Sequence, residues 1–178
     1  LRVELSVLEE PRTMSLIEKI DKKAVLEALR TQIQTEFNLV TKSHQGTTKA
    51  CTHEESRAES AKDTRATELG YLARGLAKRV LELEHSLLRL NNLSLREFSG
   101  DDKLAVGALV EVEDEHSVRV YFISPAGAGL KCQIEGIEIL SVTSLSPIGR
   151  ALVGKRLNDV IEVSLPGAKH EFNVIGVA

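Results

Sequence analysis

The groups best suited to do chemistry in this sequence are four carboxylates in its polar middle, Glu54, Glu55, Glu59 and Asp63. They lie within residues 41–68, which contain no Leu, Ile, Val, Phe or Met. Glu55 and Glu59 are four residues apart, a spacing that places two side chains on one face of a helix. Basic residues are interspersed among the acids, namely Arg57, Lys62 and Arg65. Taken alone, such a mixture of signs indicates a solvated helix surface.

Histidine and serine residues do not form a catalytic or metal-binding pattern. His53 precedes two glutamates, but the run does not match the H-E-x-x-H motif of helical metal sites. The sequence around His44 and His85 does not predict a metal site either. Ser146 and Asp159 have no nearby histidine that would serve as a base, and a helix-capping role explains Ser146. These histidine and serine residues therefore predict neither a metal site nor a catalytic pair.

Composition and charge exclude several classes of protein. The net charge of −3 over 178 residues argues against a basic nucleic-acid binder, and no apolar run approaches the roughly 18–20 residues of a membrane span. Cys51 and Cys132 are the only two cysteines, which excludes a four-cysteine zinc site, and their wide separation in sequence fits a reducing cytosol. A chain rich in Leu, Glu, Lys, Arg and Ala but poor in aromatic residues favours long helices. We expect a cytoplasmic protein without a membrane segment.

The first thirteen residues of the chain show no clear periodicity. Residues 1–13 lack the basic and apolar regions of a signal peptide, and the only methionine, Met14, stands directly before a helical pattern. We expect residues 1–13 to be an extension outside the folded unit. A genuine, ordered extension is the alternative.

Apolar residues on both sides of the polar middle predict two long helices. Before it they recur largely at steps of three or four, at Ile17, Ile20, Leu26, Leu29, Ile33, Phe37 and Val40. After it they form a near-heptad seam at Leu69, Leu72, Leu76, Val80, Leu83, Leu87 and Leu90. Such seams predict an antiparallel hairpin over residues 14–95, with a break near Asp21 and an acidic tip near 52–68.

The distal part of this hairpin must pack without large apolar residues. Alanines and side-chain stems are what remain, so this end is either simply solvated or shaped to enter something. Gly46 falls inside the first arm, where it costs about 1 kcal/mol relative to Ala. Arg74, Lys78 and Arg79 form a basic face on the second arm, which is either solvated or suited to acidic walls and RNA phosphates.

A linker over residues 91–102 leads to a segment with alternating periodicity. Residues 103–178 predict a small antiparallel sheet with strands at 106–112, 118–123, 130–134, 137–142, 160–165 and 171–177. Ser146 and Pro147 open a short helix that runs to Val153 and is closed by Gly154. The predicted fold class is α+β, a helical hairpin followed by this sheet module.

The segment 146–155, SPIGRALVGK, resembles the SPI-x-R/G-x-L-x-GK signature of GreA/GreB C-terminal domains. The strand, Pro-Gly turn and closing strand within 158–175 are similar to the same family. The resemblance covers roughly residues 16–178 and is most specific in the signature. It implies an FKBP-like fold for residues 103–178. It also implies a hairpin that enters the secondary channel of RNA polymerase and acts on backtracked or paused complexes.

In that family, acidic tip residues help to hold Mg²⁺ at the polymerase active site, where the polymerase cleaves the 3′ end of the nascent RNA. A hard cation held by carboxylates orients and activates the attacking water. The metal site belongs to the polymerase, so the resemblance implies no tightly bound cofactor and no enzyme activity in this chain. RNA polymerase and the RNA 3′ end are the partners that it implies.

Residue by residue, the resemblance places Glu59 at the family's tip glutamate and Glu68 at its later acid. Glu54 and Glu55 precede the position of the family's tip aspartate, and a turn would bring Glu55 beside Glu59 as a second metal ligand. Three tip positions depart from the family, with Ser56 in place of Asp, Ser60 in place of Asn and Asp63 in place of Tyr.

We hypothesise that the C-terminal domain docks on the polymerase, and we predict that Pro147, Ile148, Arg150 and Lys155 of the signature bind it. Because the tip is altered, a channel regulator that does not stimulate cleavage is the alternative. Two other classes remain open, a coiled-coil adaptor and a prolyl isomerase, although the latter needs a pocket usually lined by aromatic residues. A hairpin that folds back on itself is compatible with a monomer.

Overall fold

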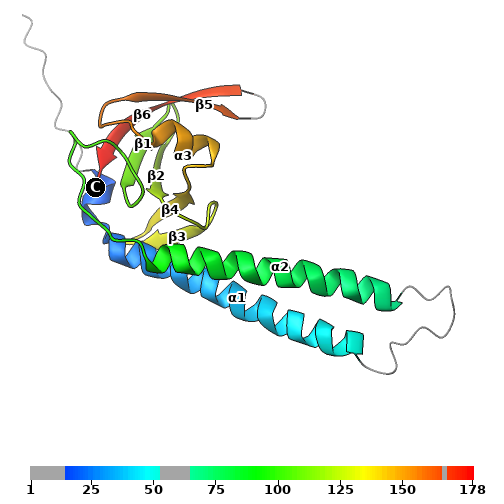
Figure 1. The fold of residues 1–178 in the computed structure, drawn as a ribbon. Coiled ribbons are helices and arrows are strands. Elements are labelled where there is room, and N and C mark those ends of the chain that lie inside the picture. Colours follow the sequence, from blue (N-terminus) through cyan, green and yellow to red (C-terminus); the bar gives the residue numbers. More distant parts are fainter. Residues whose placement is uncertain (1–14, 53–64, 166–167) are drawn as a thin grey trace, which may run out of the picture.

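The computed structural model describes residues 15–52, 65–165 and 168–178. A helical hairpin extends from a small sheet domain, and one short helix covers part of that sheet (Figure 1). In chain order the elements are η1 (Leu16–Lys19), α1 (Lys22–Thr52), α2 (Arg65–Asn91), β1 (Leu109–Glu113), β2 (Val118–Ile123), β3 (Lys131–Ile134), β4 (Ile137–Val142), α3 (Pro147–Leu152), β5 (Val160–Leu165) and β6 (Ala168–Val177). The predicted α+β class is confirmed, and residues 1–13 lie outside the described part of the chain.

Both arms of the hairpin are long, uninterrupted α-helices. α1 has 31 residues and α2 has 27, so they are about 46 and 40 Å long at 1.5 Å per residue. The predicted break before α1 is present, because the Asp21 carboxylate accepts a hydrogen bond of 2.8 Å from the Lys23 amide and caps the helix. Most of the predicted acidic tip, near residues 52–68, lies outside the described residues.

Packing between the arms weakens from base to tip. Leu83 and Leu90 of α2 are buried near the base, whereas Leu72 is 54% exposed. On the distal part of α1, the half-buried positions are occupied by His44, Thr47 and Ala50. The distal part of α1 packs without large apolar residues, as predicted, but Leu69 and Leu76 of α2 are half-buried, so the prediction is wrong for that arm. Burial of large side chains therefore stabilises the base, at about 1.5–3 kcal/mol for each.

The sheet has six strands in the order β3-β4-β2-β1-β6-β5. The prediction of an antiparallel sheet is wrong at one pair, because β2 and β4 run parallel, with Val120 beside Ile139. The cause is the loop of residues 124–130, which is tied to the end of β4 by hydrogen bonds from the Ser124 and Gly129 amides to the Val142 and Ser141 carbonyls. After β2 the chain therefore passes the position of β4 and forms β3 at the edge of the sheet. It then turns back and forms β4 between β3 and β2.

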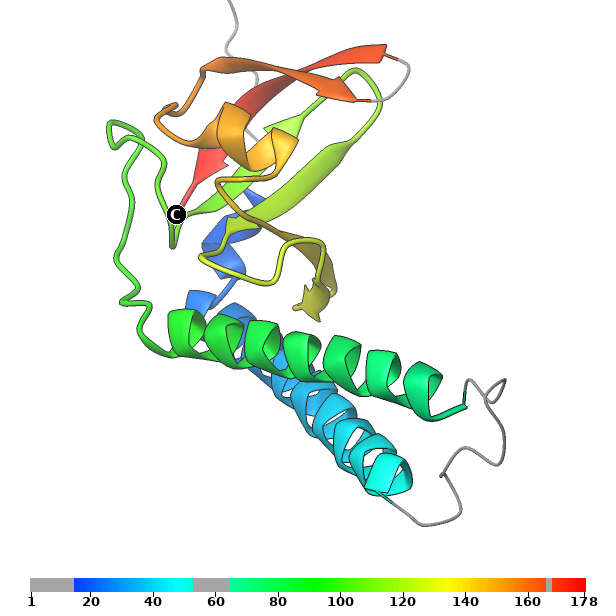
Figure 2. The same cartoon turned by 45° about the vertical axis from the view of Figure 1, so that its right-hand side comes forward.

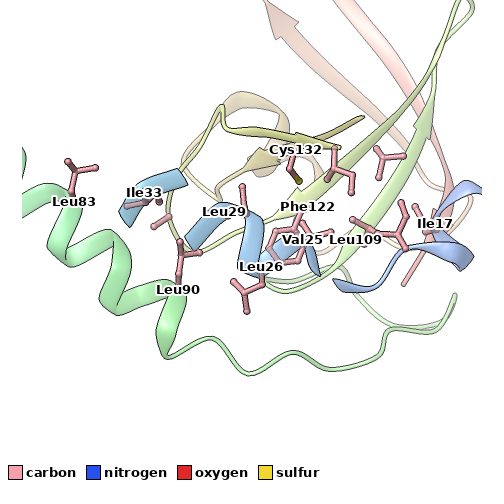
Figure 3. Close-up of a cluster of buried hydrophobic side chains, with 14 residues drawn as sticks. Ile17, Val25, Leu26, Leu29, Ile33, Leu83, Leu90, Leu109, Phe122 and Cys132 are labelled. Atoms are coloured by element: carbon pink, nitrogen blue, oxygen red, sulfur yellow. The ribbon is translucent and has the colours of Figure 1, made fainter. Parts of the chain in front are cut away.

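Hydrophobic side chains fill both faces of the sheet. On one face, Val25, Leu29 and Ile33 of α1 pack with Phe122 and Cys132 in a cluster that also takes in the base of α2 (Figure 3). On the other face, Val110, Tyr121, Leu152 and Phe172 belong to a second cluster under α3. The hairpin is therefore anchored to the sheet by a shared core, and its arms extend beyond that contact (Figure 2).

The segment before α1 is also fixed to the sheet. Glu111 of β1 is only 4% exposed, and its carboxylate accepts hydrogen bonds from the Ser15 hydroxyl and, at 3.1 Å, from the Leu16 amide. A buried carboxylate is costly unless it is hydrogen-bonded. The pairing therefore explains why the chain is held against β1 from Ser15 onwards.

Glycines in the distal arms offer a direct test of how this part of the hairpin is built. A Cβ at Gly46 or Gly75 would meet no atom within 4 Å, so packing does not require glycine there. Since glycine costs about 0.5–1 kcal/mol relative to alanine inside a helix, we expect Gly46→Ala and Gly75→Ala each to stabilise the hairpin by that amount. Urea unfolding followed by circular dichroism measures the change.

Gly149→Ala is a control that should change the free energy of unfolding in the opposite direction. A Cβ at this helical glycine would overlap the Thr143 carbonyl oxygen, so the substitution should lower the free energy of unfolding by at least about 2 kcal/mol. Destabilisation by the two distal substitutions would contradict the interpretation that nothing depends on their missing side chains.

Candidate functional site

The predicted tip residues Glu54, Glu55, Glu59 and Asp63 lie outside the described residues, and so does Ser56. The structure does describe the arms that carry them. α1 ends at Thr52 and α2 begins at Arg65, so the acidic segment 53–64 connects the far ends of two antiparallel helices. The segment that contains the four carboxylates therefore follows the end of α1 and precedes the start of α2, the two helix ends farthest along the chain from the anchored base.

The predicted basic face of α2 is divided by the fold. Arg79 turns toward α1, where its guanidinium lies 2.6 Å from the Glu36 carboxylate, and this hydrogen bond raises the pKa of Arg79. Arg74 stacks over the Tyr71 ring at 4.9 Å, and Lys78 pairs with Glu82 at 3.9 Å on the same helix. Arg79 thus joins the arms, whereas Arg74 and Lys78 remain on the exposed surface.

No group of three or more His, Cys, Asp or Glu residues able to hold a metal occurs in the described part of the chain. Cys132 is buried, and this burial raises the pKa of its thiol, so it is a poor nucleophile. The described helices contain no segment long and apolar enough to cross a membrane.

The sheet domain gives no support to the prolyl isomerase alternative. Tyr121, Phe122 and Phe172 are each at most 2% exposed, and they belong to the two cores rather than to a surface pocket. Two pockets of the described surface lie at the base of the hairpin and beside η1, and neither is lined by an aromatic side chain.

The C-terminal signature folds into α3 and the turn that follows it. The Ser146 hydroxyl accepts a hydrogen bond of 3.1 Å from the Gly149 amide and donates one of 2.8 Å to the Thr143 carbonyl. Pro147 occupies the first helical turn, as predicted. Gly149 is buried and allows the Thr143 backbone to approach closely. The serine and glycine of the signature therefore fix the helix to the preceding loop.

The end of the signature connects the sheet domain to the linker. The Gly154 amide donates to the Leu104 carbonyl at 2.8 Å, and the Leu104 amide donates to the Lys155 carbonyl at 2.7 Å. Gly154 has a φ of 85°, which favours glycine. The backbone of Gly154 and Lys155 thus holds the linker against α3, a structural role that the sequence did not reveal.

The four side chains that were assigned to polymerase binding are not equally accessible. Pro147 and Arg150 are exposed, whereas Ile148 and Lys155 are half-buried. Ile148 packs against the second core, and the Lys155 ammonium lies 3.4 Å from the Val160 carbonyl. Of this set, Pro147 and Arg150 are therefore the two side chains best placed to contact a partner.

Leu145, directly before α3, is a surface residue that periodicity did not single out. It is 79% exposed, although leucine in a β-rich segment would be expected in the core. The adjacent turn, in which the Ser146 amide donates to the Thr143 carbonyl at 2.9 Å, fixes its backbone. Residues 139–158 also contain three basic residues and no carboxylate. We call Leu145, Pro147 and Arg150 the α3 ridge.

Lys22 holds the start of α1 to the linker. It is only 6% exposed. Its ammonium donates to the Arg96 carbonyl, lies 3.3 Å from the Glu97 carboxylate and is 5.5 Å from the centre of the Phe98 ring. This single side chain therefore connects the hairpin with the segment that leads into the sheet domain.

Comparison with known proteins identifies relatives for most of this architecture. The family model described as "Transcription elongation factor, GreA/GreB, C-term" matches residues 99–178. The transcription elongation factor GreA of Bartonella tribocorum is 36% identical over 101 residues, which are 56% of this chain and 60% of the relative. The transcription inhibitor protein Gfh1 of Thermus thermophilus is 30% identical over 128 residues, 70% of this chain and 72% of the relative.

The chain thus spans about 60% of the length of the first GreA relatives that it matches. Among solved structures, GreA factor homolog 1 (Gfh1) of Thermus thermophilus is 24% identical with a TM-score of 0.35, over 84% of this chain and 94% of that one. The GreA/GreB factor from Nitrosomonas europaea is 17% identical with a TM-score of 0.31, over 54% and 78% of the two chains. The assignment to a family therefore rests on the sequence relatives.

Lys22→Ala tests the connection between hairpin and linker. Because it leaves the Arg96 carbonyl without its buried donor and Glu97 without its ion pair, we expect a loss of about 1–3 kcal/mol in the free energy of unfolding. Urea denaturation measures it. Lys23→Ala, the exposed neighbour, is the matched control and should change stability by less than about 0.5 kcal/mol. Equal effects of the two substitutions would contradict a specific role for Lys22.

Proposed function

The chain belongs to the GreA/GreB family of transcription elongation factors, and from this premise we propose that it binds RNA polymerase and acts on backtracked or paused complexes. In this proposal the hairpin enters the secondary channel of the polymerase in the cytoplasm, and the RNA 3′ end is the target. The proposal rests on one observation. The acidic segment 53–64 joins the far ends of two long arms, and the base of these arms is anchored in the sheet domain.

The shape and composition of the arms support insertion. α1 carries Lys42 and Lys49 after its last acidic residue, Glu36, and it has no large apolar residue beyond Val40. A partner helix or a hydrophobic pocket would find little to bind on that distal surface of α1. A narrow, charged passage is the environment that such a surface fits, because it requires no burial of apolar area.

The proposed chemistry depends on carboxylates of the tip. Mg²⁺ prefers oxygen ligands, so the carboxylates of Glu59 and Glu55 are suited to coordinate a metal ion at the polymerase active site. When bound there, the ion would activate the water that cleaves the RNA. The chain itself then orients the ion and supplies no nucleophile or base, so the cleavage activity belongs to the polymerase.

A second candidate is a channel regulator that does not stimulate cleavage. Two observations favour it. Ser56 has no charge at the position where the resemblance places an aspartate, and the relative matched over 128 residues is named a transcription inhibitor. Such a factor would occupy the channel without completing the metal site. The two candidates share the same binding mode and differ only in the tip.

A transcript-cleavage assay on stalled, backtracked elongation complexes separates them. If the chain is a cleavage factor, the wild type accelerates Mg²⁺-dependent cleavage and Glu59→Ala abolishes the acceleration, because a metal ligand is lost. Glu55→Ala should act in the same direction if Glu55 replaces the missing aspartate. Glu115→Ala, an exposed glutamate in the turn after β1, is the control and should leave cleavage unchanged.

Ser56→Asp provides the complementary measurement. For a factor that binds without stimulating cleavage, we expect this substitution to install the missing carboxylate and to produce measurable cleavage. Absence of cleavage by the wild type and by Ser56→Asp, together with failure to compete with an authentic Gre factor for polymerase, would refute both candidates.

We further propose that the α3 ridge docks on the polymerase while the hairpin provides reach. Leu145 and Pro147 supply apolar contact and Arg150 supplies charge, the combination typical of residues that dominate protein interfaces. Deleting the sheet domain is not a clean test, because the base of the hairpin shares its core with the sheet. Point substitutions on the ridge avoid this difficulty, since its exposed side chains do not belong to either core.

Arg150→Glu tests the docking. Reversal of an exposed charge at an interface should weaken competition with a Gre factor for polymerase by about tenfold. Lys131→Glu reverses a charge on β3, at the opposite edge of the sheet from α3 and β5, and should change competition by less than about twofold. Equal loss in the two variants would point to a general effect of charge and would contradict docking through α3.

A further inference from the structure

An arginine of α2 connects the two arms of the hairpin at the point where the buried core ends. Among the described side chains, Ile33 of α1 and Leu83 of α2 are the last before the tip that are almost fully buried, each 3% exposed. Glu36 and Arg79 lie about one helical turn beyond them, and they are 43 residues apart in sequence. The Arg79 guanidinium donates twice to one oxygen of the Glu36 carboxylate, from Nη2 at 2.6 Å and from Nε at 3.0 Å.

The Arg79 guanidinium is also held from its own helix. Its Nη1 lies 3.4 Å from the carboxylate of Glu82, which is three residues further along α2. Because a guanidinium is planar and its donors point in fixed directions, these contacts specify how α2 lies against α1 at this point. Exposed ion pairs contribute little to overall stability. The effect of this pair is therefore on the geometry of the arms rather than on the stability of the fold.

Distal to the pair, little apolar packing on α1 opposes a separation of the arms. Leu69 and Leu76 of α2 are half-buried, but α1 carries no large apolar residue after Val40. From the pair to Thr52 and Arg65, the arms extend for about 24 and 21 Å at 1.5 Å per residue. Over that length, an opening of about 5° at the pair displaces the end of an arm by about 2 Å.

We propose that Arg79 and Glu36 are positioning residues, which hold the distal arms at a defined separation and thereby place the acidic segment 53–64 within the polymerase. This inference rests on the proposed function, because it assumes that the hairpin enters the polymerase. Neither residue contacts the RNA or the metal ion, and both act through the carboxylates of the tip. Such chemistry depends on geometry, since a misplacement of about 1 Å can slow a reaction by about 100-fold.

The separation of the arms is tested without polymerase, by pulsed EPR between two spin labels. Gly46→Cys and Gly75→Cys provide the attachment sites, because a Cβ at either glycine meets no atom within 4 Å. Cys51→Ser removes a competing thiol, and Cys132 is buried. Arg79→Gln should shift the distances to longer values and broaden their distribution. Arg79→Lys, which keeps the charge but not the two-donor geometry, should give an intermediate result. An unchanged distribution in Arg79→Gln overturns the proposal.

The consequence for function is measured on stalled elongation complexes, as cleavage of the transcript or as inhibition of RNA extension, whichever the wild type produces. Arg79→Gln and Glu36→Gln should each lower the maximal effect by about two- to fivefold, because loss of an exposed ion pair shifts an equilibrium by up to about fivefold. The concentration for half-maximal effect should change by less than about twofold, since the contacts that bind polymerase remain. The double variant should lose no more than either single variant, because the two residues act through each other.

Arg119→Gln is the matched control. It makes the same substitution and breaks a pair of 3.0 Å with Asp114, but within the sheet domain, so it should change neither the arm separation nor the maximal effect. An equal loss in Arg119→Gln, or a full maximal effect in Arg79→Gln despite wider arms, overturns the positioning role. A wild type that neither affects nor binds polymerase refutes the proposed function and the positioning role with it, whereas the spin labels alone decide whether the pair holds the arms.

Discussion

Burial of Val25, Leu29 and Ile33 against the sheet is the contact on which the rest of the molecule depends. These three residues lie on one face of α1, and they pack with Phe122, Cys132 and the base of α2 (Figure 3). Without that contact the two arms would form an isolated hairpin whose distal seam is too polar to be stable alone. With it, the base is fixed, the linker is held by Lys22, and the arms extend in a defined direction from the sheet domain (Figure 1).

The distribution of apolar side chains along the arms follows from this anchoring. Stability is concentrated near Leu83 and Leu90, while Gly46, Gly75 and the half-buried His44 and Thr47 occupy the distal part. Residues that weaken a helix are tolerated there because the base supplies the tertiary packing. The same arrangement leaves the distal surface of α1 hydrophilic, whereas Tyr71 and Leu72 of α2 are exposed. The hydrophilic surface of α1 fits the proposed entry into a narrow, charged channel.

Much of the fold followed from periodicity and turn chemistry. The seams predicted both arms, and β2, β4 and β5 begin and end as predicted from alternation. The capping serine and proline placed α3 correctly. Alternation did not reveal the partner of each strand, so the parallel pairing of β2 with β4 was missed. For the candidate site, the types of residue at the tip were evident from the chain, but their placement lies outside the described residues.

The sequence by itself determined the local elements, the polar distal arms and the family signature, because these depend on neighbours a few residues apart. Tertiary structure alone decided which side chains in the signature and next to it face outward. Leu145 is exposed while Ile148 is half-buried, although both are aliphatic and only three residues apart. It also turned Arg79 toward Glu36, left Leu81 and Leu88 uncovered, and buried Glu111 beside Ser15. Each outcome depends on which distant segment packs against the residue, and periodicity along one chain does not contain that information.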